Sequence, residues 1–459
     1  MKCLAVVLIP FLLSGLISSS SPMLNETVTP IKHVIVIMQE NHSFDNYFGT
    51  YPTANGTLVG DIVSRIHRVN GLPNNVCLPY GRACLSPYPA LAVSTENPGE
   101  GRDVYEQDYN NGKMDGFPTN SGSQSMAYFD YRQIPAYWDY AEEYGLADNY
   151  FSSALTTTTP NRLLLLSGDT PVSSNYGPPP YATYNQTILG QLSTNNITWG
   201  YFDYLQPFGD LSKVYPINYI SGINQAGLHN VQDISLFFTI LSEGKNLPSV
   251  SFVNALGFRN LDEHPPTNVT AGELWTVSVV NAVMCSDYWR SSVIFIAYDE
   301  AGGYYDHVPP PQVLQINHGF DRPLHGYGER VPLLVISPYA KENYVSETLL
   351  NHMSLLRFID YNWNLFPLNE NVAKSNNMLD FFNFTQTTRS PIVLSSQGPY
   401  SARSYPIPLQ STTGGQTEQT ACSLEKTGTI SSAWIYILII PLTIAVIIGS
   451  IALKRPRKR

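Results

Sequence analysis

Two short apolar runs in this chain each end in a pair of polar residues. The runs are 34–38 and 293–298, and β-branched and aromatic residues are frequent in them. Such runs predict strands buried in a parallel sheet, and sites in open α/β sheets lie at the carboxyl ends of strands. Carboxylate and amide oxygens suit a hard or borderline cation. The candidate metal ligands at the two strand ends are Glu40, Asn41, Asp299 and Glu300.

Asp299 and Glu300 place two carboxylates next to each other at the end of an apolar strand. Adjacent buried carboxylates repel each other, and a bound cation offsets this repulsion. Gly302 and Gly303 follow, and glycine permits a tight turn and a close approach of the backbone. We therefore expect a divalent metal ion as cofactor, and its identity stays open. A solvated acidic turn, the alternative, is disfavoured by the apolar strand before it.

A run of four threonines, 156–159, stands directly before Pro160 and an apolar stretch. Proline is tolerated in the first turn of a helix, so we expect the threonines at a helix N-terminus. The free backbone N–H groups at such an end favour phosphate. A threonine hydroxyl there is a candidate nucleophile, although a threonine that only caps the helix fits the pattern too. The run leaves a choice among Thr157, Thr158 and Thr159.

Three histidines in motif-like segments are candidates for protonating a leaving group or for further metal ligation. His264 stands in DEHPP, His307 in DHVPPP, and His352 at the start of the expected helix NHMSLLRFI. The alternatives are an ordinary loop histidine for His264 and a capping or packing histidine for His352.

The remaining periodicity predicts helices and strands in alternation, which is typical of an α/β fold. Residues 53–104 are rich in Gly, Pro and Asn and are expected as long loops beside the site. The further expected helices are 134–146, 187–192 and 272–290, and the further expected strands are 197–202, 247–253 and 331–336.

Several segments together resemble one known family. They are IKHVIVIMQENHSFDNYFGTYP, YNNGKMDGF, LTTTTPNRLLLLSG, DEHPP, DEAGGYYDHVPPP, GERVPLLVISP and NHMSLLRFID. They are similar to the phosphoesterase family that joins phosphatidylcholine-hydrolysing phospholipases C and related acid phosphatases, within the alkaline-phosphatase-like superfamily. The resemblance implies a three-layer α/β sandwich with a central, mostly parallel sheet.

The resemblance also implies roles for particular residues. Thr158 stands where the family has its nucleophile, so it is expected to form a phospho-threonine intermediate and to be a further metal ligand. Asn161 is expected to contact the phosphate. The family usually has a histidine a little upstream of GKMDGF, whereas this chain has none there. Asp103 or Asp108 is the expected substitute.

The expected function is a metal-dependent phosphoric ester hydrolase, and the substrate stays open. An acid phosphatase acting on phosphate monoesters is the first expectation. The alternative is a phospholipase C acting on phosphatidylcholine-type phospholipids. A non-catalytic surface binding protein on the same fold is a further alternative, which the absent histidine supports.

Composition restricts the partners and the surroundings. Only 14% of the residues are charged and the net charge is −10, so no basic stripe is available for nucleic acid. Asn-X-Ser/Thr sequons suggest a secreted glycoprotein, although Asn41 is placed in the metal site instead. Cys77 and Cys84 could close a small loop, while the pairing of Cys285 and Cys422 stays open.

The two ends of the chain predict targeting and anchoring. Residues 1–21 read as a signal peptide and 30–388 as the catalytic domain. A Ser/Thr-rich stalk, 389–432, then leads to 433–453, which is apolar and long enough to span a bilayer as one helix. The basic tail 454–459 is expected in the cytoplasm. The protein is thus expected on the extracellular face of the cell membrane.

Overall fold

The computed structural model describes residues 26–51, 69–175, 182–205, 214–223, 227–255 and 260–395. The predicted signal peptide, transmembrane helix and basic tail lie outside these ranges, as do Cys422 and most of the predicted stalk. Within the ranges described, no helix is long and apolar enough to cross a membrane.

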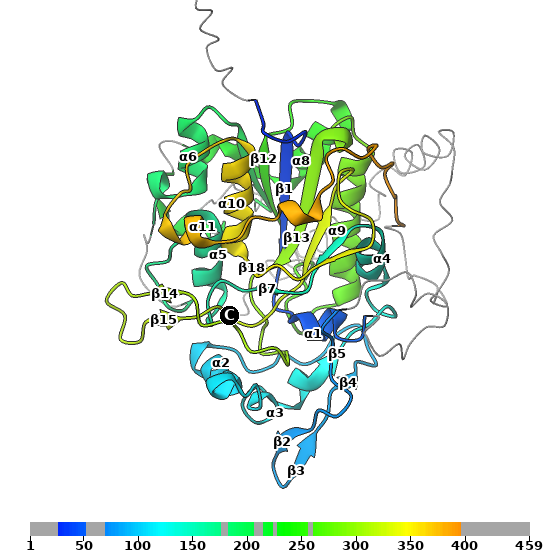
Figure 1. The fold of residues 1–459 in the computed structure, drawn as a ribbon, viewed down its shortest axis with the longest axis vertical. Coiled ribbons are helices and arrows are strands. Elements are labelled where there is room, and N and C mark those ends of the chain that lie inside the picture. Colours follow the sequence, from blue (N-terminus) through cyan, green and yellow to red (C-terminus); the bar gives the residue numbers. More distant parts are fainter. Residues whose placement is uncertain are drawn as a thin grey trace, which may run out of the picture.

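An eight-stranded sheet forms the centre of the molecule (Figure 1). Every neighbouring pair of strands in it is parallel except the two pairs that β16 makes. The predicted α/β fold with a mostly parallel central sheet is therefore confirmed. In spatial order the strands are β11 (Val231–Asp233), β9 (Trp199–Asp203), β12 (Val250–Asn254), β1 (His33–Gln39), β13 (Ser292–Tyr298), β16 (Leu333–Ile336), β6 (Gly145–Ala147) and β17 (Tyr344–Ser346).

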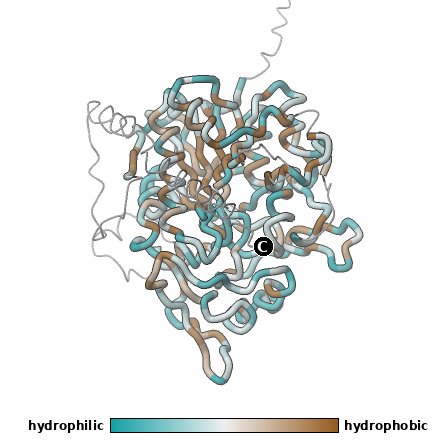
Figure 2. The backbone as a smooth tube through the Cα atoms, turned by 180° about the vertical axis from the view of Figure 1, so that it is seen from behind, coloured by the Kyte–Doolittle hydropathy of each residue, from teal (hydrophilic) through white to brown (hydrophobic). Residues whose placement is uncertain are grey.

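Helices cover both faces of this sheet, which makes three layers (Figure 1). Apolar residues are concentrated in the central strands between the layers (Figure 2). These strands are apolar on both faces because helices cover both faces of the sheet. One helix group holds α5 (Thr158–Ser167), α6 (Ile188–Thr194), α10 (His352–Asn362) and α11 (Glu370–Lys374). The other holds α4 (Pro135–Glu143), α8 (Ile234–Glu243) and α9 (Val269–Met284).

Smaller elements lie beyond the carboxyl edge of the sheet (Figure 1). Several of them pack on a second apolar cluster, formed by Met114, Phe117, Met126 and Tyr305. A disulfide joins Cys77 and Cys84, as the sequence suggested. These elements are α1 (Phe44–Phe48), β2 (Leu78–Tyr80), β3 (Ala83–Leu85), β4 (Tyr88–Pro89), α2 (Arg102–Tyr109), α3 (Phe117–Asn120) and β5 (Ala127–Tyr128). Two-residue strands elsewhere are β7 (Tyr150–Phe151), β8 (Ala182–Thr183), β10 (Ile220–Ser221), β14 (Gln315–Ile316), β15 (Leu324–His325) and β18 (Leu350–Asn351).

Two predicted helix boundaries were wrong. The helix expected over 134–146 ends at Glu143, and residues Gly145–Ala147 form β6 instead. Pairing with β16 and β17 outweighs the local helical pattern there, and Gly145 suits the strand because a Cβ on it would lie 2.5 Å from the Phe381 ring. The helix expected over 272–290 occupies Val269–Met284, because Asn268 caps its start by accepting the N–H of Ala271 at 3.1 Å.

The pairing of β1 with β13 decides which strand-end residues meet. The two strands are parallel, with Gln39 opposite Tyr298. The N–H of Asp299 donates to the carbonyl of Gln39 at 3.2 Å. Glu40 and Asp299 therefore leave the sheet as immediate neighbours.

The turns after these two strands approach each other closely. Asn41 has a φ of 65° and Gly302 a φ of 62°, both in the left-handed region. A Cβ on Gly302 would lie 2.6 Å from the Cβ of Asn41 and 2.7 Å from its carbonyl oxygen. The N–H of Gly302 also donates to Glu300 Oε2 at 2.9 Å. Only glycine fits there, and it fixes Asn41 and Glu300 together.

A buried arginine joins three segments below the same sheet edge. Arg330 is fully buried and forms ion pairs with Asp45 at 3.0 Å, Asp148 at 2.9 Å and Asp306 at 3.2 Å. Its guanidinium also lies over the Phe44 ring, 4.2 Å from the centroid. Because the guanidinium has fixed donor directions, these contacts hold α1, the end of β6 and the segment after β13 in one arrangement.

We expect Gly302→Ala to lower the free energy of unfolding by more than Gly319→Ala does. Both glycines have positive φ, so both variants incur about 1–2 kcal/mol for the left-handed backbone. A Cβ on Gly319 meets no atom within 4 Å, whereas one on Gly302 meets Asn41. Urea denaturation of the two variants measures the difference, and equal losses would show that the close approach is unimportant.

Arg330→Met should lower the free energy of unfolding by about 3–5 kcal/mol, because it leaves buried carboxylates without their partner. Arg322→Met is the matched control, since Arg322 is half exposed and pairs with Asp103 and Glu106 at the surface. Its loss should stay within about 1 kcal/mol. Chemical denaturation provides both values, and a small loss for Arg330→Met would contradict the structural role of this cluster.

Candidate active site

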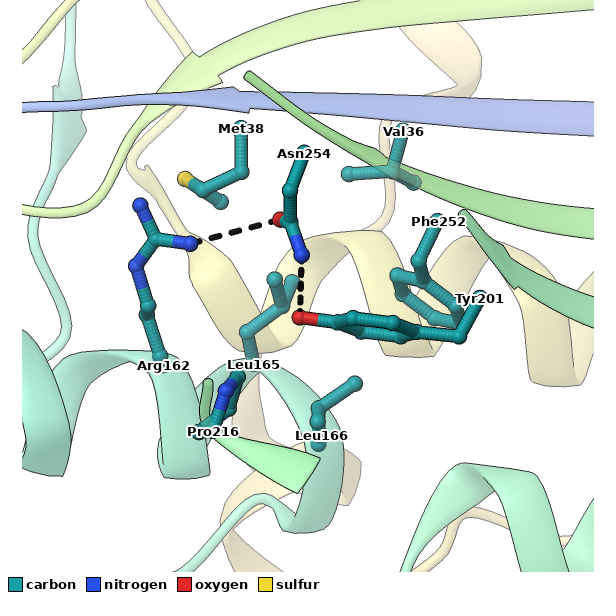
Figure 3. A pocket seen from close by; sticks show the side chains of 9 residues that line it. All are labelled: Val36, Met38, Arg162, Leu165, Leu166, Tyr201, Pro216, Phe252 and Asn254. Atoms are coloured by element: carbon teal, nitrogen blue, oxygen red, sulfur yellow. Dashed lines mark hydrogen bonds between the residues drawn. The ribbon is translucent and has the colours of Figure 1, made fainter. Parts of the chain in front are cut away.

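Arg162 lies between the carboxylates that leave β1 and β13. Its Nη2 is 2.7 Å from Glu40 Oε1 and its Nε is 2.9 Å from Asp299 Oδ2. Its Nη1 donates to Asn254 Oδ1 at 3.3 Å, at the end of β12 (Figure 3). Arg162 was not among the residues predicted from the sequence, although it belongs to the segment TTTTPNR. It is the positive charge that three strand ends share.

Apolar side chains line the space beside this arginine (Figure 3). They come from β1, β12 and α5, and they are Val36, Met38, Phe252, Leu165 and Leu166. Asn254 is in turn held by the Tyr201 hydroxyl. Because few waters can screen charges against such a wall, the ion pairs of Arg162 are stronger than surface pairs.

The strand-end carboxylates carry more negative charge than Arg162 can offset. Burial raises the pKa of Asp299 to about 6, although Arg162 opposes the shift. Burial and the neighbouring Asp299 raise the pKa of Glu300 well above its usual range. Burial also raises the pKa of Glu40. A further cation would stabilise the charged form of all three groups.

Asn41 offers an acceptor that suits such a cation. The residue is buried, and its Nδ2 donates to Glu100 Oε1 at 3.1 Å. Its Oδ1 is also buried and has no hydrogen-bond partner within the described part of the chain. A buried acceptor without a partner is costly. This oxygen and the buried carboxylates therefore fit a divalent metal ion.

Among the four threonines, Thr158 has the hydroxyl that meets a strand-end carboxylate. Its Oγ1 lies 3.4 Å from Glu300 Oε1, and the residue is partly exposed at the first position of α5. Thr156 donates to the carbonyl of Ser173, and Thr159 accepts from the Tyr215 hydroxyl. Thr157 is buried at the N-cap position. A substrate can therefore reach Thr158 more easily than its neighbours.

Asn161, which the resemblance predicts as a phosphate contact, forms hydrogen bonds within the chain. It is fully buried, its Oδ1 accepts the N–H of Ala154 at 2.9 Å, and its Nδ2 donates to the carbonyls of Ala154 and Thr156. All its polar atoms are thus used within the chain. Asn161 shapes the loop that presents Thr158.

Glu100 reaches the site from outside the sheet, and sequence reasoning missed it. Its Oε1 lies 3.1 Å from Asn41 Nδ2 and 3.4 Å from His264 Nε2. The proposed substitutes for the absent histidine do not lie there. Asp103 pairs with Arg322, and Asp108 is buried and accepts from Ser121 and Asn120. The flanking Gly99 and Gly101 were the available signal, because Gly99 is closely approached by Asn120 and Ser121 and Gly101 has a φ of 123°.

His264 faces the same group of charges. Its Nδ1 is 2.7 Å from the carbonyl of Pro265. Burial lowers the pKa of His264, but Glu100 and Glu40 outweigh that effect and raise it overall. With its side chain one-third exposed, His264 can give a proton to a group that enters from solvent.

A cage of hydroxyl groups fixes the loop that carries His264. The carboxylate of Glu263 is fully buried and accepts bonds from the hydroxyls of Tyr47, Tyr137 and Tyr298, at 2.5–2.7 Å. Its backbone carbonyl bonds to His42 Nε2 at 2.9 Å. Burial raises the pKa of Glu263 to about 7. The DEHPP motif thus contributes Glu263, which anchors the loop, and His264, which is partly exposed.

The other two predicted histidines are bound elsewhere. His352 is fully buried, its Nε2 bonds to the carbonyl of Tyr298 at 2.9 Å, and burial lowers its pKa to about 4. His307 uses both ring nitrogens, on Asp45 at 2.6 Å and on Asn70 at 3.0 Å. Both support the loops around the site, and neither is placed to protonate a leaving group.

One further group has spacing that could hold a metal ion. The ligand atoms of Asp45, Asp306 and His307 lie within 4.8 Å of one another, and the described ranges contain no second group of this kind. The guanidinium of Arg330 already donates to both carboxylates, so an ion there would compete with it. The strand-end carboxylates are farther apart, with Arg162 between Glu40 and Asp299.

Sequence comparison finds several similar phospholipases. The chain is 27% identical to a non-hemolytic phospholipase C of Burkholderia pseudomallei, over 74% of this chain and 56% of that one. It is 28% identical to non-specific phospholipase C6 of Arabidopsis thaliana, over 69% and 63%. With phospholipase C A of Mycobacterium tuberculosis H37Rv the identity is 26%, over 72% of each chain. The chain thus spans little more than half of the first of these relatives.

Structural comparison finds murine ectonucleotide pyrophosphatase/phosphodiesterase 5, solved in complex with AMP. The TM-score is 0.39 at 8% identity, over 77% of this chain and 100% of that one. A lipoteichoic acid synthase from Listeria monocytogenes gives a TM-score of 0.38 at 8% identity, over 75% of this chain and 76% of that one.

The model of the Phosphoesterase family matches residues 31–366, which include every site residue described above. The chain belongs to the Phosphoesterase family.

Proposed function

We propose that this protein is a metal-dependent phosphoesterase of the phospholipase C type, which cleaves phosphodiesters with Thr158 as nucleophile. The observation that supports it best is the position of the Thr158 hydroxyl, partly exposed at the amino end of α5 and 3.4 Å from Glu300. The family assignment supports the chemistry, since its members are phosphoesterases by name.

Attack by Thr158 begins with loss of its hydroxyl proton towards Glu300 Oε1, the acceptor that it meets. The oxygen then bonds to phosphorus, and the bond from phosphorus to the leaving oxygen breaks. The amino end of α5 contributes positive potential where the phosphoryl oxygens gain charge. The N–H of Thr159 is already bound to Asn175 Oδ1 at 2.7 Å and Pro160 has no N–H, so of the first three helix residues Thr158 would supply the N–H for the substrate.

The metal would be held by Glu40, Asn41, Asp299, Glu300 and Thr158. When bound, it would lower the pKa of the Thr158 hydroxyl and stabilise negative charge on the phosphoryl group. The ion pairs of Arg162 keep Glu40 and Asp299 oriented towards this site.

His264 gives its proton to the leaving alcohol. Its raised pKa keeps it protonated more of the time at neutral pH than an ordinary histidine. Water then attacks the phospho-threonine and gives a proton to His264. The bond from phosphorus to the Thr158 oxygen breaks, and the proton held by Glu300 returns to that oxygen as the phosphoryl product leaves. Each step thus uses a group that the chain places at the sheet edge.

The relatives favour a phospholipase C over an acid phosphatase, which was the first expectation from the sequence. The three similar proteins named above are all called phospholipases C. A phospholipid is therefore the proposed substrate, with a phosphorylated headgroup and diacylglycerol as products. The non-catalytic alternative is weaker, because Thr158 and the strand-end ligands are all in place. The C-terminal anchor and the extracellular location also remain proposals.

Thr158→Ala should lower kcat for a chromogenic phosphocholine diester by at least about 10³-fold, with the free energy of unfolding nearly unchanged. Thr157→Ala is the matched control and should keep most of the activity. Mass spectrometry of acid-quenched enzyme should find a phosphoryl group on Thr158. Activity that survives in Thr158→Ala and falls in Thr157→Ala would move the nucleophile by one residue.

Removing the metal should abolish turnover, and a divalent ion should restore it. Metal content then separates the two candidate sites. Asn41→Leu should lose most of the bound metal, because it removes a buried oxygen ligand, while His307→Gln should keep it. Elemental analysis of the purified variants provides the comparison. Loss of metal from His307→Gln alone would place the ion at Asp45 and Asp306.

A further inference from the structure

One carboxylate at the site belongs neither to a strand end nor to the nucleophile helix. Glu100 comes from the segment before α2, and its side chain is about one-quarter exposed, at 28%. It touches Asn41 and His264, which lie on opposite sides of it in the sequence. Neither contact offsets its charge fully, because Asn41 is neutral and His264 is charged only when protonated.

The backbone around Glu100 is held tightly. The N–H of Gly99 donates to the carbonyl of Ser121 at 2.8 Å, and the Ser121 hydroxyl donates back to the carbonyl of Gly99 at 3.0 Å. A Cβ on Gly303 would lie 2.4 Å from the oxygen of Gly99. Gly101 has a φ of 123°. The Glu100 carboxylate is therefore a fixed feature of the site.

The charge of Glu100 reaches the groups that surround Thr158. Its carboxylate bonds to Asn41, whose backbone packs against Gly302 in the turn after Glu300, and Glu300 meets Thr158. The other acidic groups at this edge are offset in part by Arg162, and the proposed divalent ion would offset more. The Glu100 side chain is 28% exposed, whereas Asp299 and Glu300 are buried, so an incoming phosphate would meet its negative charge.

We propose that Glu100 is a specificity-determining residue, whose fixed carboxylate disfavours phosphate monoesters and favours phosphodiesters, above all those with a cationic group. A monoester carries close to two negative charges near neutral pH, and a diester carries one. Repulsion from a carboxylate grows with the charge of the ligand. A quaternary ammonium group near Glu100 would instead be attracted. The inference rests on the proposed function and narrows its substrate class.

Glu100→Gln separates charge from shape. Glutamine keeps the length of the side chain and an oxygen that can accept the N–H of Asn41, and it removes the negative charge. Glu96→Gln is the matched control, since Glu96 is an exposed carboxylate in the same segment and has no contact with Asn41 or His264 among those described. A general effect of net charge would appear in both variants.

Binding is measured in the Thr158→Ala background, which prevents turnover. Isothermal titration calorimetry at pH 7.5 with phenyl phosphate, a dianion, and phenyl phosphocholine, a diester, gives a Kd for each. Adding Glu100→Gln should lower the Kd of phenyl phosphate about tenfold. It should leave the Kd of phenyl phosphocholine unchanged or raise it. High salt should shrink the difference. Adding Glu96→Gln should change neither Kd.

Equal changes for both ligands would overturn the inference, since a merely structural role of Glu100 would move them together. Failure to bind either ligand would overturn it too. Kinetics with Thr158 intact gives a second readout. There, Glu100→Gln should raise kcat/KM for p-nitrophenyl phosphate relative to p-nitrophenyl phosphocholine. Wild-type protein that binds both ligands and cleaves neither would refute the proposed function, and the ratio of the two Kd values would still decide the role of Glu100.

Discussion

Negative charge buried where β1 and β13 end is the constraint on which this site depends. Parallel pairing brings Glu40 and Asp299 together, and Glu300 follows directly. Arg162 binds the first two, and its partners include the end of β12. The helix that supplies Arg162 also supplies Thr158 at its first position. The demand for a counter-charge therefore fixes α5, and Thr158 with it, against the sheet edge.

A second arginine, Arg330, also pairs with several carboxylates, but its cluster is closed to solvent. Arg330 is fully buried, and the carboxylates around it are closed off from solvent. The strand-end group remains open through Thr158, His264 and Glu100, which are all partly exposed. Clusters of acidic residues with similar composition thus become a structural joint in one place and a reactive site in the other. The difference lies in whether the arginine satisfies every carboxylate.

Loops far apart in the sequence complete the site through anchors that do no chemistry themselves. Glu263 and its tyrosine hydroxyls fix the loop of His264, and Asn161 fixes the loop of Thr158. The close contact between Gly99 and Gly303 fixes Glu100. These anchors explain why motifs that look catalytic contain buried residues beside exposed ones. They also explain how a carboxylate can be kept at the mouth of a site for anionic substrates.

The sequence by itself determined the family, the parallel central sheet and the strand-end positions of Glu40 and Asp299, because buried strands and helix starts leave local patterns in the chain. It left a choice among Thr157, Thr158 and Thr159, in which the resemblance favoured Thr158, because which hydroxyl faces Glu300 depends on how α5 packs against the sheet edge. Asn161, His307 and His352 bond to partners in distant segments or in the backbone, so their predicted roles at the substrate stay predictions. Arg162 and Glu100 emerged only in the tertiary structure, because long-range ion pairs and hydrogen bonds depend on how segments pack, and periodicity does not encode that packing.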